Sequence, residues 1–175
     1  MRAIFACAVL AAGCAHSEHV PQVVARHELI LRYPGHLVID AGHEPLTEAP
    51  RFSGLASFVH CVGPAHWHAL QAEWHGQRAL ALSGIAIGLA AAGVLGYALV
   101  GVGAAAGSDN WVAVPLLAGL IASSGGIMTA WFARWDVLRA HGNAVDAVNY
   151  YNDEIGSWGG RCGPAPAVQT SRPPA

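Results

Sequence analysis

Lysine is absent from this 175-residue chain, and charge of either sign is scarce. Only 11% of the residues are charged, and nine arginines against eleven acidic residues leave a formal net charge of −2. Proteins that bind nucleic acids neutralise phosphates with clustered cations. The composition therefore argues against a nucleic-acid partner.

Charged residues are missing altogether from two long apolar runs, which lie between Arg78 and Arg134 and are separated by Asp109. Each run exceeds the roughly 20 residues that a helix needs to cross a bilayer, and lipid forces such a run to be helical. A buried soluble hairpin is the alternative, but the remaining chain is too short to cover it. We expect a first transmembrane helix at residues 79–106, a turn at 107–110 and a second transmembrane helix at 111–133.

Sequence patterns typical of catalytic or nucleotide-binding sites are missing as well. The chain has no Gly-x-Ser-x-Gly elbow and no paired-carboxylate constellation of the kind used in acid–base catalysis, and its acidic residues all lie outside the apolar runs. Gly101, Gly103 and Gly107 follow no strand and have the wrong spacing for a nucleotide-binding loop. We therefore expect neither enzymatic activity nor a cofactor.

Small residues recur at four-residue intervals along both apolar runs. In lipid, helices gain no hydrophobic energy from association, so small side chains that allow close backbone approach provide the contact. The main expectation is that these ridges pack the hairpin on itself, and self-association into a homo-oligomer is the alternative. The ridges consist of Gly84, Gly88, Ala92 and Gly96 in the first helix and of Ala118, Ala122, Gly126 and Ala130 in the second.

The N-terminal residues combine Arg2 with a short apolar run, which is typical of a signal peptide and too short to span a membrane. The segment LAAGC, which ends at Cys14, resembles the lipobox of bacterial lipoproteins, although that pattern more often has a branched residue in place of Ala11. The resemblance implies that residues 1–13 are removed and that Cys14 carries lipid at the start of a tether, residues 14–25. An ordinary signal peptide that is cleaved nearby is the alternative.

Lipidation at Cys14 would place the mature N-terminus outside the cytoplasm, and a two-helix hairpin returns the C-terminus to the same side. Both soluble parts would then be periplasmic. Arg78, Arg134 and Arg139 flank the hairpin on that side, which is the reverse of the usual arginine excess in cytoplasmic loops. We give the export signal more weight, and insertion by another route is the alternative.

Short alternating runs after the tether predict a three-stranded β-meander. Pro34-Gly35 and Gly42 are turn signals, and Ser53 is expected to cap a short helix. Apolar stripes predict that both membrane helices continue out of the bilayer as an antiparallel pair, on which the meander rests. We place the meander and short helix at residues 26–62, the juxtamembrane helices at 63–78 and 134–156, and a disulfide segment with a proline-rich, disordered tail at 157–175.

Two cysteines remain once the signal peptide and the lipid site are set aside. In an oxidising compartment, Cys61 and Cys162 are expected to form a disulfide. With a helical rise of about 1.5 Å per residue, the helix pair brings them to comparable heights above the membrane. Two free thiols are the alternative.

Ten histidines are many for a chain of this length. His60, His66, His68 and His75 cluster with Cys61 before the first apolar run, which makes a periplasmic metal-binding accessory subunit the alternative function. His66 and His68 point apart on a helix, so no set of three or four ligands emerges and we expect no metal. The weak candidate ligands are His66, His68 and His75.

A polar and aromatic stretch follows the second apolar run. It comprises Asn149, Tyr150, Tyr151, Asn152 and Asp153, and it resembles the Tyr-Asn segment of uncharacterised bacterial envelope lipoproteins, which implies no activity. On a helix, Asn149, Asn152 and Asp153 lie on adjacent turns and are expected to bind the meander by hydrogen bonds. Recognition of a partner is the alternative role.

These features predict a mainly α fold, in which a two-helix transmembrane hairpin extends outside the membrane as an antiparallel pair and carries a small β-meander. They also predict a non-enzymatic lipoprotein of the bacterial cell envelope with a structural or protein-interaction role. The expected partners are membrane lipid and either a second copy or another envelope protein.

Overall fold

The computed structural model describes residues 29–42, 44–106, 112–158 and 162. The predicted signal peptide, Cys14, the tether and the turn at 107–110 lie outside the described residues, as does most of the predicted C-terminal tail. The described chain forms two compact units. We call residues 74–140 the hairpin unit and residues 29–73 with 141–162 the sheet unit.

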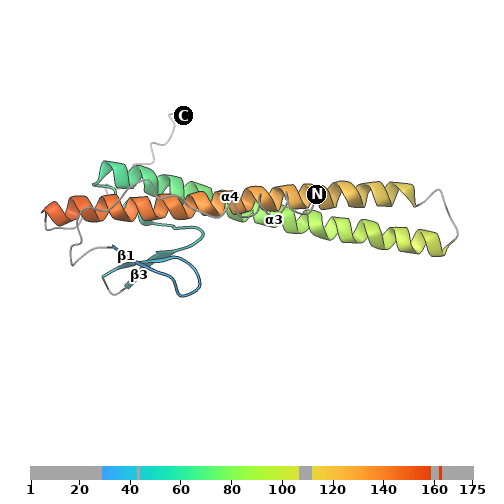
Figure 1. The fold of residues 1–175 in the computed structure, drawn as a ribbon, viewed down its shortest axis with the longest axis horizontal. Helices are drawn as coiled ribbons and strands as arrows, with labels where there is room; N and C mark the ends of the chain where they lie inside the picture. Colours follow the sequence, from blue (N-terminus) through green and yellow to red (C-terminus); the bar gives the residue numbers. More distant parts are fainter. Residues whose placement is uncertain (1–28, 43, 107–111, 159–161, 163–175) are drawn as a thin grey trace, which may run out of the picture. The chain divides into compact units, whose positions relative to one another are not determined.

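The fold is mainly helical, and its two longest elements are α3 and α4, which pack as an antiparallel pair (Figure 1). Each is long and apolar enough to cross a membrane. These findings confirm the predicted fold class at the level of a helix pair with a small antiparallel sheet. In chain order the elements are β1 (Leu29–Arg32), β2 (Val38–Ala41), β3 (Glu44–Glu48), α2 (Leu55–Phe58), α3 (Gly63–Ala105) and α4 (Ala113–Trp158).

The predicted juxtamembrane helices are continuous with the apolar helices. α3 begins at Gly63 and runs without interruption into the first apolar run, because no proline or glycine pair breaks it after its first turn. α4 likewise continues through the polar residues that follow the second run and ends at Trp158, two residues beyond the predicted boundary.

The three strands form an antiparallel sheet in the order β1–β2–β3. Leu29 pairs with Ala41 in the first ladder, and Ala41 pairs with Glu44 in the second. Gly35 and Gly42 occupy the two turns with φ angles of 116° and 71°, a region in which glycine has no steric penalty. The turn signals read from the sequence therefore lie where the chain reverses.

The core of the sheet unit draws on β1, β2, α2 and the parts of α3 and α4 that belong to this unit. A three-stranded sheet cannot bury enough apolar surface by itself, so the strands and α2 pack against the helical residues of this unit. The rings of Phe58 and Tyr151, for example, lie 5.6 Å apart. The largest fully buried side chains are Leu37, Ile39, Phe52, Leu55, Val59, Val148 and Tyr151.

The short helix α2 differs from its prediction at the N-terminus. Gly54, with a φ of 88°, occupies the cap position instead of Ser53, and it makes no side-chain cap bond. The backbone N–H of Ala56 donates to Glu73 Oε1 over 3.0 Å. A carboxylate from α3 therefore satisfies an amide that a capping serine would ordinarily satisfy.

Cys61 and Cys162 are joined as a disulfide in the sheet unit, with their Cα atoms 5.5 Å apart. The bond links residues 101 positions apart in the sequence. In the chain-entropy model, closing a loop of this length stabilises a fold by up to about 4.7 kcal/mol. The disulfide therefore ties the chain just before α3 to the chain that follows α4.

Candidate functional site

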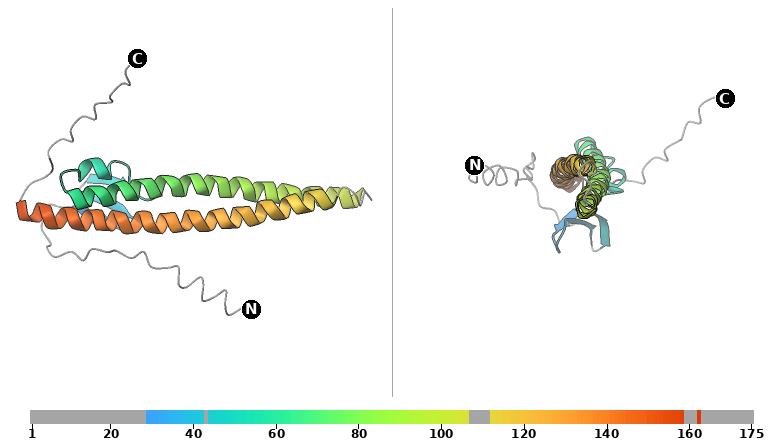
Figure 2. Two further views of the ribbon diagram at one scale, coloured as in Figure 1. Left: turned by 90° about the horizontal axis from the view of Figure 1, so that it is seen from above. Right: turned by 90° about the vertical axis from the view of Figure 1, so that its right-hand side faces the viewer.

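The seam between the helices of the hairpin unit has a seven-residue period. The two helical segments of this unit lie side by side in Figures 1 and 2. A period of seven is the repeat that keeps one face of each helix toward its partner in a left-handed pair. The buried residues of this repeat are Ala79, Ala86 and Gly93 on α3 and Gly119, Gly126 and Ala133 on α4.

The two backbones lie very close together at Gly96. A Cβ atom added there would lie 2.8 Å from the Cα of Gly119 and 2.9 Å from the carbonyl oxygen of Pro115. Both neighbours are backbone atoms, which cannot move aside by changing a rotamer. Glycine is therefore required at this position by the distance between the helices.

The predicted four-residue ridges do not form this seam. Gly84 and Gly88 are not packed against α4, with open space where a Cβ would lie, and Ala92 is exposed. On α4, Ala118 is exposed, and Ala122 is half-buried. Gly96 and Gly126 are the two ridge members that lie buried in the seam, whereas Ala130 is exposed. The prediction missed the heptad because a four-residue repeat drifts off the contact face, whereas a repeat of seven stays on it.

A buried polar layer crosses the seam near the end of the apolar runs. His75 Nδ1 lies 2.8 Å from Asp136 Oδ1, and these side chains are only 8% and 5% exposed. Arg78 Nε lies 3.2 Å from Asp136 Oδ2. Both carboxylate oxygens of Asp136 are therefore engaged by α3, which satisfies a charge that would otherwise be costly to bury.

The sheet unit contains a second polar layer, built from residues seven positions away on each helix. His68 Nδ1 lies 2.9 Å from Asn143 Oδ1, and the ring of His68 stacks on Tyr150 with centroids 5.4 Å apart. A spacing of seven residues places His68 and His75 on one face of α3. It did not show that each faces a polar residue of α4.

The histidines of the cluster considered for metal binding, which includes the weak candidates His66, His68 and His75, are engaged with other groups. His66 Nδ1 lies 2.9 Å from the carbonyl oxygen of Ala56, and His60 Nδ1 lies 2.8 Å from that of Ser57. Within the described residues, no three His, Cys, Asp or Glu side chains are grouped so that they could hold a metal ion.

His141 is a half-buried titratable group that the sequence did not single out. Its ring lies edge-on to Phe52, with centroids 5.8 Å apart, and its Nε2 atom has no hydrogen-bond partner in the described structure. Burial lowers the pKa of His141 below its ordinary value of 6.5. The folded chain therefore favours the neutral ring. Because the unfolded chain binds a proton at His141 more readily, the free energy of unfolding falls as the pH drops below 6.5.

The Tyr-Asn stretch is used inside the sheet unit. Tyr151 is buried against Phe58, and Asn152 binds the free edge of β1. The backbone N–H of Leu29 donates to Asn152 Oδ1 over 3.0 Å, and Asn152 Nδ2 donates to the Leu29 carbonyl oxygen over 2.9 Å. The amide thus pairs with the strand as a neighbouring strand would, in line with the expected binding of the meander. Asn149 and Asp153, on the neighbouring turns of α4, are both half-buried.

Replacing Asn152 by alanine is expected to destabilise the sheet unit by about 1–3 kcal/mol, because both backbone groups of Leu29 lose their partner. Hydrogen exchange measures the effect directly, and the Leu29 amide should exchange faster than in the parent. Glu154→Ala, at an exposed position of the same helix, is the control and should change stability by no more than about 0.5 kcal/mol. Unchanged exchange in Asn152→Ala would contradict this role.

Arginines and tryptophans gather where the apolar runs end in the hairpin unit. The guanidinium of Arg78 lies 5.2 Å from the ring centroid of Trp74, and that of Arg139 lies 5.6 Å from Trp135. Such stacking holds a cation over an aromatic face. We call the following residues the arginine–tryptophan collar: Trp74, Arg78, Trp131, Arg134, Trp135 and Arg139.

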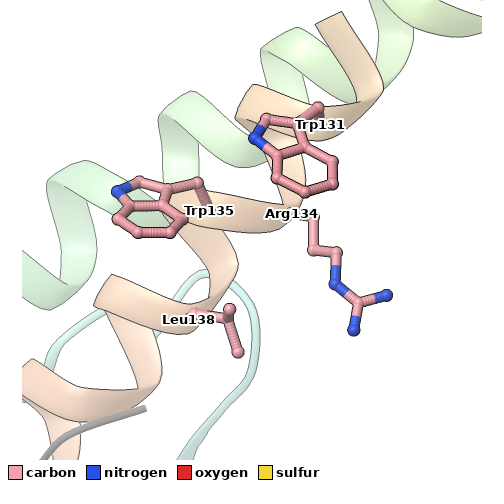
Figure 3. A pocket seen from close by; sticks show the side chains of 4 residues that line it. All are labelled: Trp131, Arg134, Trp135 and Leu138. Carbon is pink, nitrogen blue, oxygen red and sulfur yellow. The ribbon is translucent and has the colours of Figure 1, made fainter. Parts of the chain in front are cut away.

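A pocket lies on the α4 part of the collar. Trp131, Arg134, Trp135 and Leu138 line it (Figure 3). The two indole rings stand one turn apart, and the Arg134 side chain extends away from the helix. The lining contains no carboxylate, hydroxyl, thiol or imidazole, so the pocket offers an apolar wall and one cation rather than groups for acid–base chemistry.

No protein-family model, curated protein or solved structure matches this chain. The function is therefore inferred from the burial, contacts and charges of the described residues. Two features carry that inference: the uncovered apolar surface of the helix pair and the collar at its boundary.

Proposed function

We propose that the hairpin unit crosses a membrane and anchors the sheet unit at the membrane surface. The observation that carries this proposal is the exposure of the apolar helices. In the most apolar stretch of each helix, only 17% is buried within the chain for α3 and only 11% for α4. A core helix of a soluble protein would be mostly buried, whereas lipid covers the outer surface of a spanning helix.

The outward side chains fit this environment. Ile87 and Val94 on α3 and Ile121 and Ile127 on α4 are each well over half exposed. In water, so large a continuous apolar surface would drive aggregation. In a bilayer it lies in its preferred solvent, while the small residues of the seam let the two helices pack closely.

The collar supports the same placement. Tryptophan and arginine are enriched where a membrane meets water, because an indole ring is amphipathic and an arginine can extend its charge toward the headgroups. The collar begins where the charge-free runs end. Trp111, at the start of the second apolar run, lies outside the described residues.

We further propose that the protein is an envelope lipoprotein whose lipid is attached at Cys14. The lipobox resemblance motivates the lipid, and the Cys61–Cys162 bond is in keeping with an oxidising compartment. Both soluble parts then lie on the periplasmic side.

The role proposed for the sheet unit is structural or protein-binding, without catalysis. Most of the Tyr-Asn stretch is committed to internal contacts, so partner recognition would fall to other surfaces. Ile30 and Tyr33, at 50% and 66% exposure, are the exposed apolar side chains of β1 and its following turn. No observation favours the metal-binding alternative, since the four histidines of that cluster each contact another group.

Intact mass of the membrane-extracted protein tests the lipoprotein proposal. The expected mass lacks residues 1–13, carries acyl chains, and gains two thiol labels only after reduction. Cys14→Ser should abolish the acyl mass. Cys7→Ser, which alters a cysteine that leaves with the signal peptide, should give the same mature mass as the parent. An unprocessed chain with free thiols would overturn both the lipid and the periplasmic placement.

A further inference from the structure

We propose that the pocket lined by Trp131, Arg134, Trp135 and Leu138 binds the phosphodiester headgroup of an anionic membrane phospholipid. This inference rests on the proposed membrane placement of the hairpin unit and adds a specific lipid contact to it. Three properties of the pocket support it: the direction in which it faces, the engagement of the neighbouring arginines and its charge.

The pocket faces away from the partner helix. The seam of α4 in this region consists of Ala133 and Asp136, both of which are buried. Trp131 and Trp135 are 45% and 44% exposed, and with 3.6 residues per turn they lie on a different side of the helix from the seam. In a membrane, this face meets lipid rather than α3.

Arg134 is the collar cation that is available to a ligand. Arg78 is held by Asp136, and Arg139 stacks on Trp135. Arg134 is exposed, and among the described residues it has no hydrogen-bond or ion-pair partner. It is also the first charged residue after the second apolar run, which places it at headgroup depth when the run spans the bilayer.

The chemistry of the pocket matches the boundary region of a phospholipid. A guanidinium offers a planar fork of N–H donors that suits two phosphate oxygens. The indoles and Leu138 provide an apolar wall for the glycerol and upper acyl region, and each indole also has an N–H donor. One lipid can therefore bind the guanidinium through its phosphate and the apolar wall through its glycerol and upper acyl region.

Charge favours an anionic lipid over both a zwitterionic lipid and a second copy of this chain. The collar carries three arginines, and Asp136 is the acidic residue among them that neutralises part of their charge. A choline group would meet this positive field unfavourably. The same collar on a second copy would be repelled, because like charges would face each other.

The test uses the purified full-length protein reconstituted in vesicles of phosphatidylcholine alone or mixed with phosphatidylglycerol. Native mass spectrometry after mild extraction measures the ratio of the two lipids that remain bound. Arg134→Gln is expected to lower the preference for phosphatidylglycerol about fivefold, which is the contribution of one arginine near an anionic surface. Arg134→Lys keeps the charge and should retain most of that preference.

Arg51→Gln is the matched control, because Arg51 is an exposed arginine of the sheet unit. It should leave lipid selectivity unchanged. Equal selectivity in the parent and Arg134→Gln would overturn the inference, as would displacement of bound lipid by inorganic phosphate, which would identify a site for free anions. Alkaline carbonate extraction is run in parallel. Release of the parent protein would refute the membrane proposal itself, whereas retention without lipid selectivity would refute the headgroup site alone.

Discussion

Replacing Gly96 by alanine is expected to destabilise the α3–α4 pair by about 1–3 kcal/mol, the usual effect of forcing an extra group into a packed interface. The added methyl group would lie 2.8 Å from the Cα of Gly119 and 2.9 Å from the Pro115 carbonyl oxygen, so the helices must separate to admit it. Loss of close contact along the seam is the physical cause. Thermal unfolding in mild detergent, followed by tryptophan fluorescence, measures the change.

Gly88→Ala provides the matched control. Gly88 is also a glycine within the apolar part of α3, but an added Cβ would have nothing within 4 Å. Its substitution should therefore be neutral, or stabilising by up to about 1 kcal/mol through helix propensity. Equal destabilisation by Gly88→Ala and Gly96→Ala would show that the face carrying the four-residue ridge is also packed against another helix, for example in a homo-oligomer.

Replacing Asp136 by alanine is expected to destabilise the hairpin unit by about 3–5 kcal/mol, the usual effect of removing one partner from a buried ion pair. The change leaves the buried ring of His75 without its partner and removes the ion pair to Arg78. Replacing both His75 and Asp136 by leucine should restore most of the loss, because an apolar pair leaves no unsatisfied group in the seam. The same unfolding measurement compares the single and double variants.

The chain contains a control of the same chemistry at the surface. His36 Nε2 lies 3.1 Å from Glu48 Oε2, with side chains that are 50% and 70% exposed. Glu48→Ala should therefore change stability by no more than about 1 kcal/mol, because water screens the pair and solvates the remaining histidine. If Asp136→Ala proved as mild as Glu48→Ala, the layer would not hold the helices together.

Much of the fold could be predicted from local patterns. Charge-free runs longer than a bilayer crossing specify helices, because unpaired backbone groups are too costly in an apolar environment. Pro34-Gly35 and Gly42 specify turns, because glycine adopts positive φ angles freely. The pairing of Cys61 with Cys162 followed from elimination among four cysteines. Each of these inferences depends on residues that are close in sequence or few in number.

The sequence by itself therefore determined that two apolar helices, a small meander and one cysteine pair are present. It did not determine which face of each helix meets the other. Both helices are apolar all round, and small residues occur on more than one face, so neither hydropathy nor residue size selects the seam. Tertiary packing selected the heptad face, brought Gly96 against Gly119 and set His75 opposite Asp136. That register depends on how far one helix slides along the other, and only contacts between residues far apart in sequence decide it.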